Sequence, residues 1–112
     1  MDIRRIESGK RDFLPLLLLG DEQEDMIDRY LERGTMYVLE DDGVKAECVV
    51  TDEGGGILEL KSIAVAPDCK GKGYGKTLVN FLVRTYRAQY TVLQVGTRDS
   101  PSTIPFYESC GF

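Results

Sequence analysis

Alternating apolar and polar residues predict four short strands in the first 65 residues of the chain. These strands cover residues 3–6, 36–40, 44–51 and 57–65. The turn Asp41-Asp42-Gly43 joins the second and third strands into a hairpin, and three consecutive glycines at 54–56 make the next turn. In the strand at 57–65 the apolar phase shifts at Ser62 and Ile63, which indicates a β-bulge.

A period of 3.6 residues predicts three helices around these strands. The first covers 14–19, with Asp12 as its N-cap and Gly20 at its end. The second follows Asp21, which forms a capping box with Glu24, and ends at Gly34 as the residue after the helix. The third covers 75–87. The apolar faces of the second and third helices consist of Met26, Ile27, Tyr30 and Leu31, and of Leu78, Val79, Leu82, Val83 and Tyr86.

The last part of the chain adds a strand at 92–95 and a short helix at 104–109. A strand–helix–strand unit places the strand at 92–95 parallel to the strand at 57–65. Since antiparallel hairpins precede this unit, the sequence predicts a single domain over 1–112 of the α/β class. Its core is a mixed antiparallel and parallel twisted sheet that is flanked by helices.

Composition limits the chemistry of this domain. The 112 residues include no His, which excludes a Ser-His-Asp triad, a Cys-His pair and a His-ligated metal site. The three cysteines have no CxxC spacing, so we expect no metal site and a reducing, cytoplasmic location. No apolar run approaches the roughly 18 residues of a membrane span, and the charged first residues show no secretory signal, so no membrane association is expected.

Charge is distributed unevenly along the chain. Residues 1–68 hold 8 Lys/Arg against 17 Asp/Glu, a balance of −9, whereas residues 69–98 hold 6 Lys/Arg and no acid. A short basic segment suits an anion and the acidic front suits a cation. Nucleic acid is not expected as a partner, because most of the chain would repel phosphate.

The basic segment begins with a glycine-rich turn between a strand and a helix. Gly71, Gly73 and Gly75 let successive backbone N–H groups converge, and Lys70, Lys72 and Lys76 add positive charge at a helix N-terminus. This combination predicts a phosphate-binding loop. The Walker A pattern fails because Lys70 occupies its first glycine position, and the spacing of the glycines does not match the dinucleotide-binding pattern.

Two segments of the chain resemble signatures of the GNAT superfamily of N-acetyltransferases. Lys70 to Gly75 matches the acyl-CoA pattern of Gln or Arg, two residues, Gly, one residue, and Gly or Ala, with Lys70 in place of the usual first residue. Phe106 to Phe112 resembles the family's second signature, which closes in F-Y-E-x-x-G-F. The resemblance implies the GNAT fold and transfer of an acetyl group from acetyl-CoA to an amine by direct attack.

The resemblance also implies roles for individual residues. The diphosphate of acetyl-CoA is expected on residues 71–76, and its pantetheine arm between the strands at 57–65 and 92–95. Tyr107 is expected to protonate the departing thiolate, and Glu59 is the candidate general base because Gln94 cannot accept a proton. The predicted cofactor-binding residues are Ile63, Ala64, Val65, Lys70, Gly71, Lys72, Gly73, Tyr74, Gly75, Lys76 and Ser100.

The chain departs from the family at its C-terminal end. GNAT proteins usually continue past the second signature, so the sequence predicts a fold that lacks the last strands. The strand at 92–95 is therefore expected to have an unpaired edge, which favours a homo-oligomer. The acceptor is open between a small-molecule amine and a peptide amine, and the alternative function is a CoA-binding domain without transferase activity.

Overall fold

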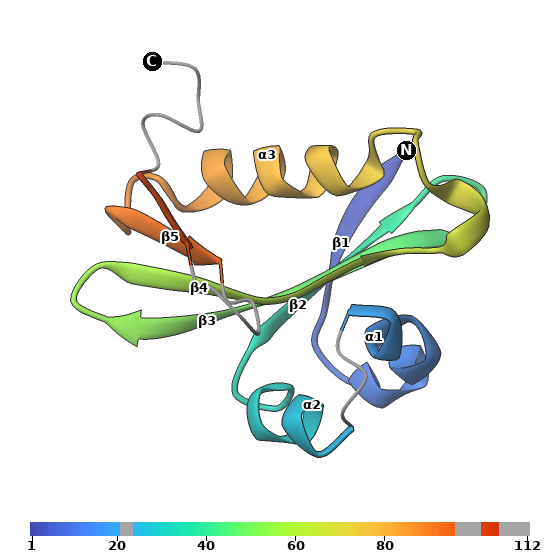
Figure 1. Cartoon of the computed structure of the whole chain (residues 1–112), viewed down its shortest axis with the longest axis horizontal. Helices are drawn as coiled ribbons and strands as arrows, with labels where there is room; N and C mark the ends of the chain where they lie inside the picture. The colour runs from blue at the N-terminus through green and yellow to red at the C-terminus, as the bar shows by residue number, and fades with distance from the viewer. Residues whose placement is uncertain (21–23, 96–101, 106–112) are drawn as a thin grey trace.

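The structure is a computed structural model that describes residues 1–20, 24–95 and 102–105. These residues contain six strands, three α-helices and two short 3-10 helices, η1 and η2 (Figure 1). Their bounds are β1 Asp2–Ile6, η1 Lys10–Phe13, α1 Leu14–Gly20, α2 Glu24–Tyr30, β2 Thr35–Glu40, β3 Val44–Gly54, β4 Ile57–Val65, η2 Pro67–Cys69, α3 Tyr74–Tyr86, β5 Val92–Val95 and β6 Ser102–Pro105.

The strands form one sheet in the order in which they occur along the chain, from β1 to β6. All neighbours pair antiparallel except β4 and β5, which pair parallel because α3 connects them as a crossover. Helix α3 covers one face of the sheet, and α1 and α2 cover the other (Figure 1). The predicted mixed sheet and its parallel pair are confirmed. None of the helices in the described ranges is long and apolar enough to cross a membrane.

The alternation of the strands divides the core into two apolar clusters, one on each face of the sheet. The cluster under α3 contains Tyr37, Leu39, Ala46, Cys48, Val50, Leu58, Leu60, Cys69, Tyr74, Leu78, Leu82, Val83 and Leu93. The cluster under α1 and α2 contains Ile6, Leu17, Ile27, Tyr30, Leu31, Met36, Val38 and Val49. Both faces of the central strands are therefore buried, which fixes their register.

A bulge interrupts β4 where the sheet begins to divide. Val49 pairs with Ser62 and Val50 pairs with Leu60, so Lys61 is the extra residue, one position before the predicted shift. The parallel pairing of β4 with β5 also ends here, at Leu60 and Val95. Among the described residues, no β5 residue pairs with positions 61–65 of β4, so this edge of the strand is open.

The region after β5 differs from the sequence prediction. Ile104 and Pro105 belong to β6, which pairs antiparallel with all four residues of β5, so the helix predicted to begin at Ile104 is wrong at these positions. The predicted unpaired edge of β5 is also wrong, because β6 takes up the backbone hydrogen-bonding groups of that edge. Residues 106–109 of the predicted helix lie outside the described residues.

Two details of the helical segment also differ from the sequence prediction. Asp12 was predicted to cap the helix at 14–19, but it lies inside η1, which runs directly into α1 and has Gly9 as its N-cap, in the left-handed region at φ 70°. Met26 is 36% exposed and does not belong to the buried face of α2. The predicted cap Asp21 lies outside the described residues.

Gly34 is required after α2 because a side chain at this position would have no room, and not because its backbone is left-handed. It is absent from the residues with positive φ, so the predicted role as a C-terminal glycine cap is wrong. A Cβ atom on Gly34 would lie 2.7 Å from Cγ1 of Val49 and 2.8 Å from the carbonyl oxygen of Tyr30. The chain therefore passes too close to β3 for any side chain at this position.

Lys10 closes the end of α2 from a distance in sequence. Its Nζ donates hydrogen bonds to the carbonyl oxygens of Leu31 at 2.8 Å, Glu32 at 3.3 Å and Gly34 at 2.7 Å. The last carbonyl groups of a helix have no partner within the helix and carry partial negative charge. One ammonium group thus satisfies three carbonyl groups where the chain leaves α2 and enters β2.

Candidate functional site

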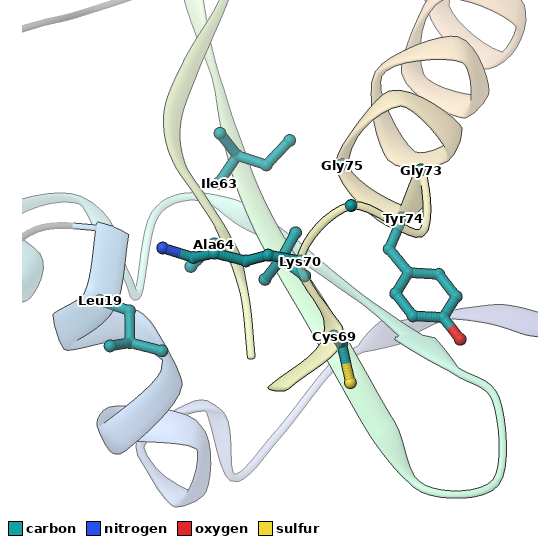
Figure 2. Close-up of a pocket in the computed structure, with 10 residues that line it drawn as sticks. Leu19, Ile63, Ala64, Cys69, Lys70, Gly73, Tyr74 and Gly75 are labelled. Atoms are coloured by element: carbon teal, nitrogen blue, oxygen red, sulfur yellow. The ribbon is translucent and has the colours of Figure 1, made fainter. Parts of the chain in front are cut away.

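A pocket of about 570 Å³ lies between the open part of β4 and the N-terminus of α3 (Figure 2). Its lining comes from three places in the fold: the end of α1, the last residues of β4, and the loop that leads into α3. The lining residues are Leu19, Ile63, Ala64, Val65, Cys69, Lys70, Gly71, Gly73, Tyr74 and Gly75. Eight of the predicted cofactor-binding residues therefore meet at one pocket, and Leu19 and Cys69 are additions that sequence reasoning missed.

The backbone of the loop explains two of its glycines. Gly71 has φ 85° and Gly73 has φ 81°, a region that residues with a side chain rarely adopt. A Cβ atom at either position would meet nothing within 4 Å, so the glycines serve the backbone conformation and leave the space above the loop open. Gly73 is also the N-cap of α3, whose first N–H groups have no partner within the helix. The loop thus presents backbone donors and the positive end of a helix dipole to the pocket.

The three lysines of the loop are not equivalent. Lys70 lines the pocket, and Figure 2 shows its side chain extended along the side of the pocket where Leu19 lies. Lys72 and Lys76 are exposed and do not contribute to the lining. Their ammonium groups can therefore contact only an anion that extends beyond the pocket.

Tyr74 anchors the start of α3 to the hairpin between β2 and β3. Its hydroxyl group donates a hydrogen bond of 2.7 Å to Oδ2 of Asp41, and its side chain is buried. This hydrogen bond raises the pKa of Tyr74 above its ordinary value, and burial adds to the effect. Tyr74 was predicted to contact the cofactor, and the structure also gives its hydroxyl group a structural partner.

Glu59 occupies the place where β4 and β5 are still paired, on the other side of the bulge from the pocket. It is 8% exposed and lies between Thr51 of β3 and Gln94 of β5 in the register of the sheet. Gln94 donates a hydrogen bond to its carboxylate through Nε2, and the Lys61 ammonium forms an ion pair with it. The carboxylate is thus held in one position by two donors at the inner end of the open edge of β4.

A second carboxylate, Glu47, was not identified from the sequence. Its side chain is fully buried on the face of α1 and α2, where Ser62 donates a hydrogen bond of 2.7 Å to Oε1. Oε2 has no hydrogen-bond partner among the described residues. Burial raises the pKa of Glu47 from 4.5 to about 8, against the opposing effect of the Ser62 hydrogen bond. The sequence signal that could have found Glu47 is an acidic residue in the apolar phase of a predicted strand. In the sheet Glu47 lies between Val38 and Ala64.

Glu47 should make the stability of the protein fall as the pH rises from about 4.5 to 8. Its pKa is higher in the folded than in the unfolded chain, so folding binds a proton in this range. Each pKa unit corresponds to about 1.4 kcal/mol, and no His contributes a competing transition. Urea unfolding between pH 5 and 9 should show this decrease in the parent, and Glu47→Gln should remove it.

A surface variant is the control for this measurement. Glu7 is exposed, so Glu7→Gln should keep the decrease of the parent protein. An unfolding free energy of Glu47→Gln that falls with pH as steeply as that of the parent would assign the effect to another group.

Two predicted site residues, Tyr107 and Ser100, lie outside the described residues, and their roles stay predictions. Cys48 and Cys69 are buried free thiols. The described part of the chain holds no group of three or more His, Cys, Asp or Glu side chains that could bind a metal ion. The chemistry available at the site is therefore that of a backbone anion cradle, an open strand edge and a fixed carboxylate.

Comparison with known proteins agrees with this geometry. Residues 32–112 match the profile of the family described as "Acetyltransferase (GNAT) domain". An uncharacterized N-acetyltransferase of Bacillus subtilis (strain 168), YvbK, is 32% identical over 114 residues, which cover 96% of this chain and 74% of that protein.

Solved structures give the same result. An IAA acetyltransferase from Bacillus cereus ATCC 14579 has a TM-score of 0.76 at 33% identity, over 88% of this chain and 68% of its own. A GNAT family acetyltransferase from Elizabethkingia anophelis with acetyl-CoA bound has a TM-score of 0.80 at 28% identity, over 88% of this chain and 66% of its own. The family profile covers most of this chain and the similarity to YvbK nearly all of it, so the chain belongs to the GNAT family of acetyltransferases.

Proposed function

We propose that this protein transfers the acetyl group of acetyl-CoA to an amine of a small molecule or a peptide. The observation that carries the proposal is the pocket, in which the glycine-lysine loop and the open edge of β4 meet. Relatives with the same fold contain acetyl-CoA or CoA, which supports acetyl-CoA as the co-substrate. Glu59, at the inner end of the open edge, supplies a base for the acceptor amine.

The cofactor is proposed to bind in two parts. The N–H groups of residues 71–76, together with Lys70, Lys72 and Lys76, hold the diphosphate at the positive end of α3. The pantetheine arm follows Ile63, Ala64 and Val65, and its amides pair with backbone groups of β4 that have no β5 partner among the described residues. Ser100 is proposed as a further cofactor contact.

The reaction proceeds by direct attack in this proposal. Glu59 takes a proton from the acceptor ammonium, and the free amine attacks the acetyl carbonyl carbon. A backbone N–H at the bulge polarises that carbonyl group. The C–S bond breaks, and Tyr107 donates a proton to the CoA thiolate. The proposal needs no acyl-enzyme: Cys48 and Cys69, the cysteines among the described residues, are buried free thiols.

A CoA-binding domain without transferase activity is the second candidate. It is favoured by the ion pair of the Lys61 ammonium with Glu59, because a substrate amine would need the same carboxylate. Release of free thiol from acetyl-CoA across a panel of amines separates the two functions. Amine-dependent release supports the transferase, whereas tight CoA binding without release for any amine supports the binding domain.

One finer proposal concerns the location of the protein. We propose a cytoplasmic location, because the composition and the buried thiols suit a reducing compartment. The predicted homo-oligomer has lost its basis, since β6 pairs with the edge of β5 that was to form the contact.

Replacement of Tyr107 by Phe should lower turnover more than it raises the KM for acetyl-CoA. The change removes only the hydroxyl group, and loss of a general acid typically costs about 10²–10⁴ in rate. Steady-state kinetics with the best amine of the panel measures both constants. Parent-like turnover would show that Tyr107 has no role as an acid.

A further inference from the structure

The amine of Lys61 already lies on the carboxylate proposed as the general base. Lys61 is the extra residue of the β4 bulge, and its Nζ forms an ion pair with Oε2 of Glu59. Its side chain is 23% exposed, whereas Lys70 and Lys72 of the loop and Lys76 of α3 are exposed. Lys61 of the chain itself therefore lies where the ammonium group of an acceptor would pair with Glu59.

A second carboxylate adds to the negative charge around Lys61. The pKa of Glu53 is lowered, chiefly by the hydrogen bond from Thr51, with contributions from Arg33 and from the positive charge of Lys61. Lys61 thus forms an ion pair with Glu59 on β4, and its charge contributes to the lowered pKa of Glu53 on β3. The surroundings of the Glu59 carboxylate suit a primary ammonium group, and in the described structure the Lys61 ammonium takes this place.

The open edge of β4 leads to this amine. The pocket lining on β4 ends at Ile63, and Lys61 lies two residues further, about 7 Å along a strand. Seen from the pocket, Leu60 and Val95 are the first residues at which β4 pairs with β5. A cofactor arm between the two strands cannot pass this point. An arm that runs from the loop along Val65 and Ile63 brings its acetyl end to the bulge.

We propose that Lys61 is an internal acceptor, so that the protein acetylates its own ε-amine from bound acetyl-CoA. The inference rests on the proposed function, because it uses the same cofactor and base. The Lys61 ammonium gives a proton to Glu59, and Nζ attacks the acetyl carbonyl carbon. The C–S bond breaks, and the products are an amide at Lys61, CoA with a protonated thiol, and one proton released to solvent.

Self-acetylation changes the site in two ways. The neutral amide no longer neutralises Glu59, which then keeps the hydrogen bond from Gln94 as its one partner among the described residues. The acetylated side chain also occupies the place of an acceptor amine, so modification lowers turnover of external amines. External primary amines in turn compete with Lys61 and slow its modification.

The test is mass spectrometry of the whole chain after incubation with acetyl-CoA and no amine, followed by peptide mapping. We expect one acetyl group at Lys61, formed at a rate that is independent of protein concentration. Lys70, Lys72 and Lys76 serve as internal controls for chemical acetylation, since exposed lysines report the uncatalysed background. Lys61→Arg keeps the positive charge and cannot form the amide, so it should lose the modification. Glu59→Gln should slow it.

The same samples are assayed for thiol release with the amine panel, which separates the possible failures. Acetylation of Lys61 above the level of the exposed lysines supports the inference, with or without turnover of external amines. Turnover of an external amine while Lys61 stays at the background level overturns the inference and leaves the proposed function intact. Absence of both CoA binding and thiol release overturns both.

Discussion

Glu59→Gln is expected to lower the turnover of external amines by about 10²–10⁴, the usual cost of losing a general base. The amide has nearly the shape of the carboxylate and can still accept the hydrogen bond from Gln94, but it cannot take a proton. The KM for acetyl-CoA should change little, because Glu59 does not line the pocket. Steady-state kinetics between pH 6 and 10 measures the effect.

The pH series tests the role and not only the loss of activity. An alkyl amine with an ordinary pKa near 10.4 becomes increasingly neutral as the pH rises, so the need for a base decreases. The deficit of Glu59→Gln should therefore shrink toward pH 10. Glu7→Gln is the control, since Glu7 is an exposed carboxylate outside the pocket lining, and it should turn over like the parent. A deficit that is constant with pH, or equal in both variants, would contradict the role of Glu59.

Gly73→Asp is expected to weaken the affinity for CoA about 100-fold or more. Gly73 is the N-cap of α3 in the left-handed region at φ 81°, which Asp enters more readily than most residues with a side chain, so the folded structure should be retained. Its carboxylate would accept hydrogen bonds from the N–H groups proposed to hold the diphosphate, and would repel it. Isothermal titration calorimetry with CoA measures the affinity.

Gly73→Asn is the matched control for this substitution. Asn has nearly the size of Asp, caps helices equally well, and tolerates the left-handed backbone of Gly73 at φ 81°. It lacks the negative charge, so it should lose far less affinity than Gly73→Asp. Equal affinities of the two variants would show that the loop does not bind the diphosphate.

Local patterns predicted most of the fold and the candidate cofactor loop. The hairpin at Asp41-Asp42-Gly43, the helix that begins near Gly75 and the parallel pair of β4 and β5 follow from turn residues, periodicity and connection rules. The loop could be predicted because the glycines and lysines that form it are contiguous in sequence.

The errors concern features that depend on residues distant in the sequence. Ile104 and Pro105 were assigned to a helix, but pairing with β5 places them in a strand. Gly34 carries no local sign that Val49 of β3 lies within 3 Å of a Cβ position there. Glu47 was not singled out in the sequence, because its burial depends on helices distant along the chain that cover both faces of β3.

The hydrogen bonds of Lys10 fix the end of the segment that contains α1 and α2, so this segment can vary while β1 and β2 stay in place. Ile6 pairs with Met36, so the chain leaves the sheet and returns to it at the same place, and Lys10 fastens the return beside Gly34. The entropy of closing this loop depends only weakly on its length. Insertions between Phe13 and Tyr30, and replacements there that spare the buried Leu17, Ile27 and Tyr30, can therefore reshape the wall that Leu19 contributes to the pocket without altering the pairing of β1 with β2. Variants with new acceptor preferences are best sought in this segment.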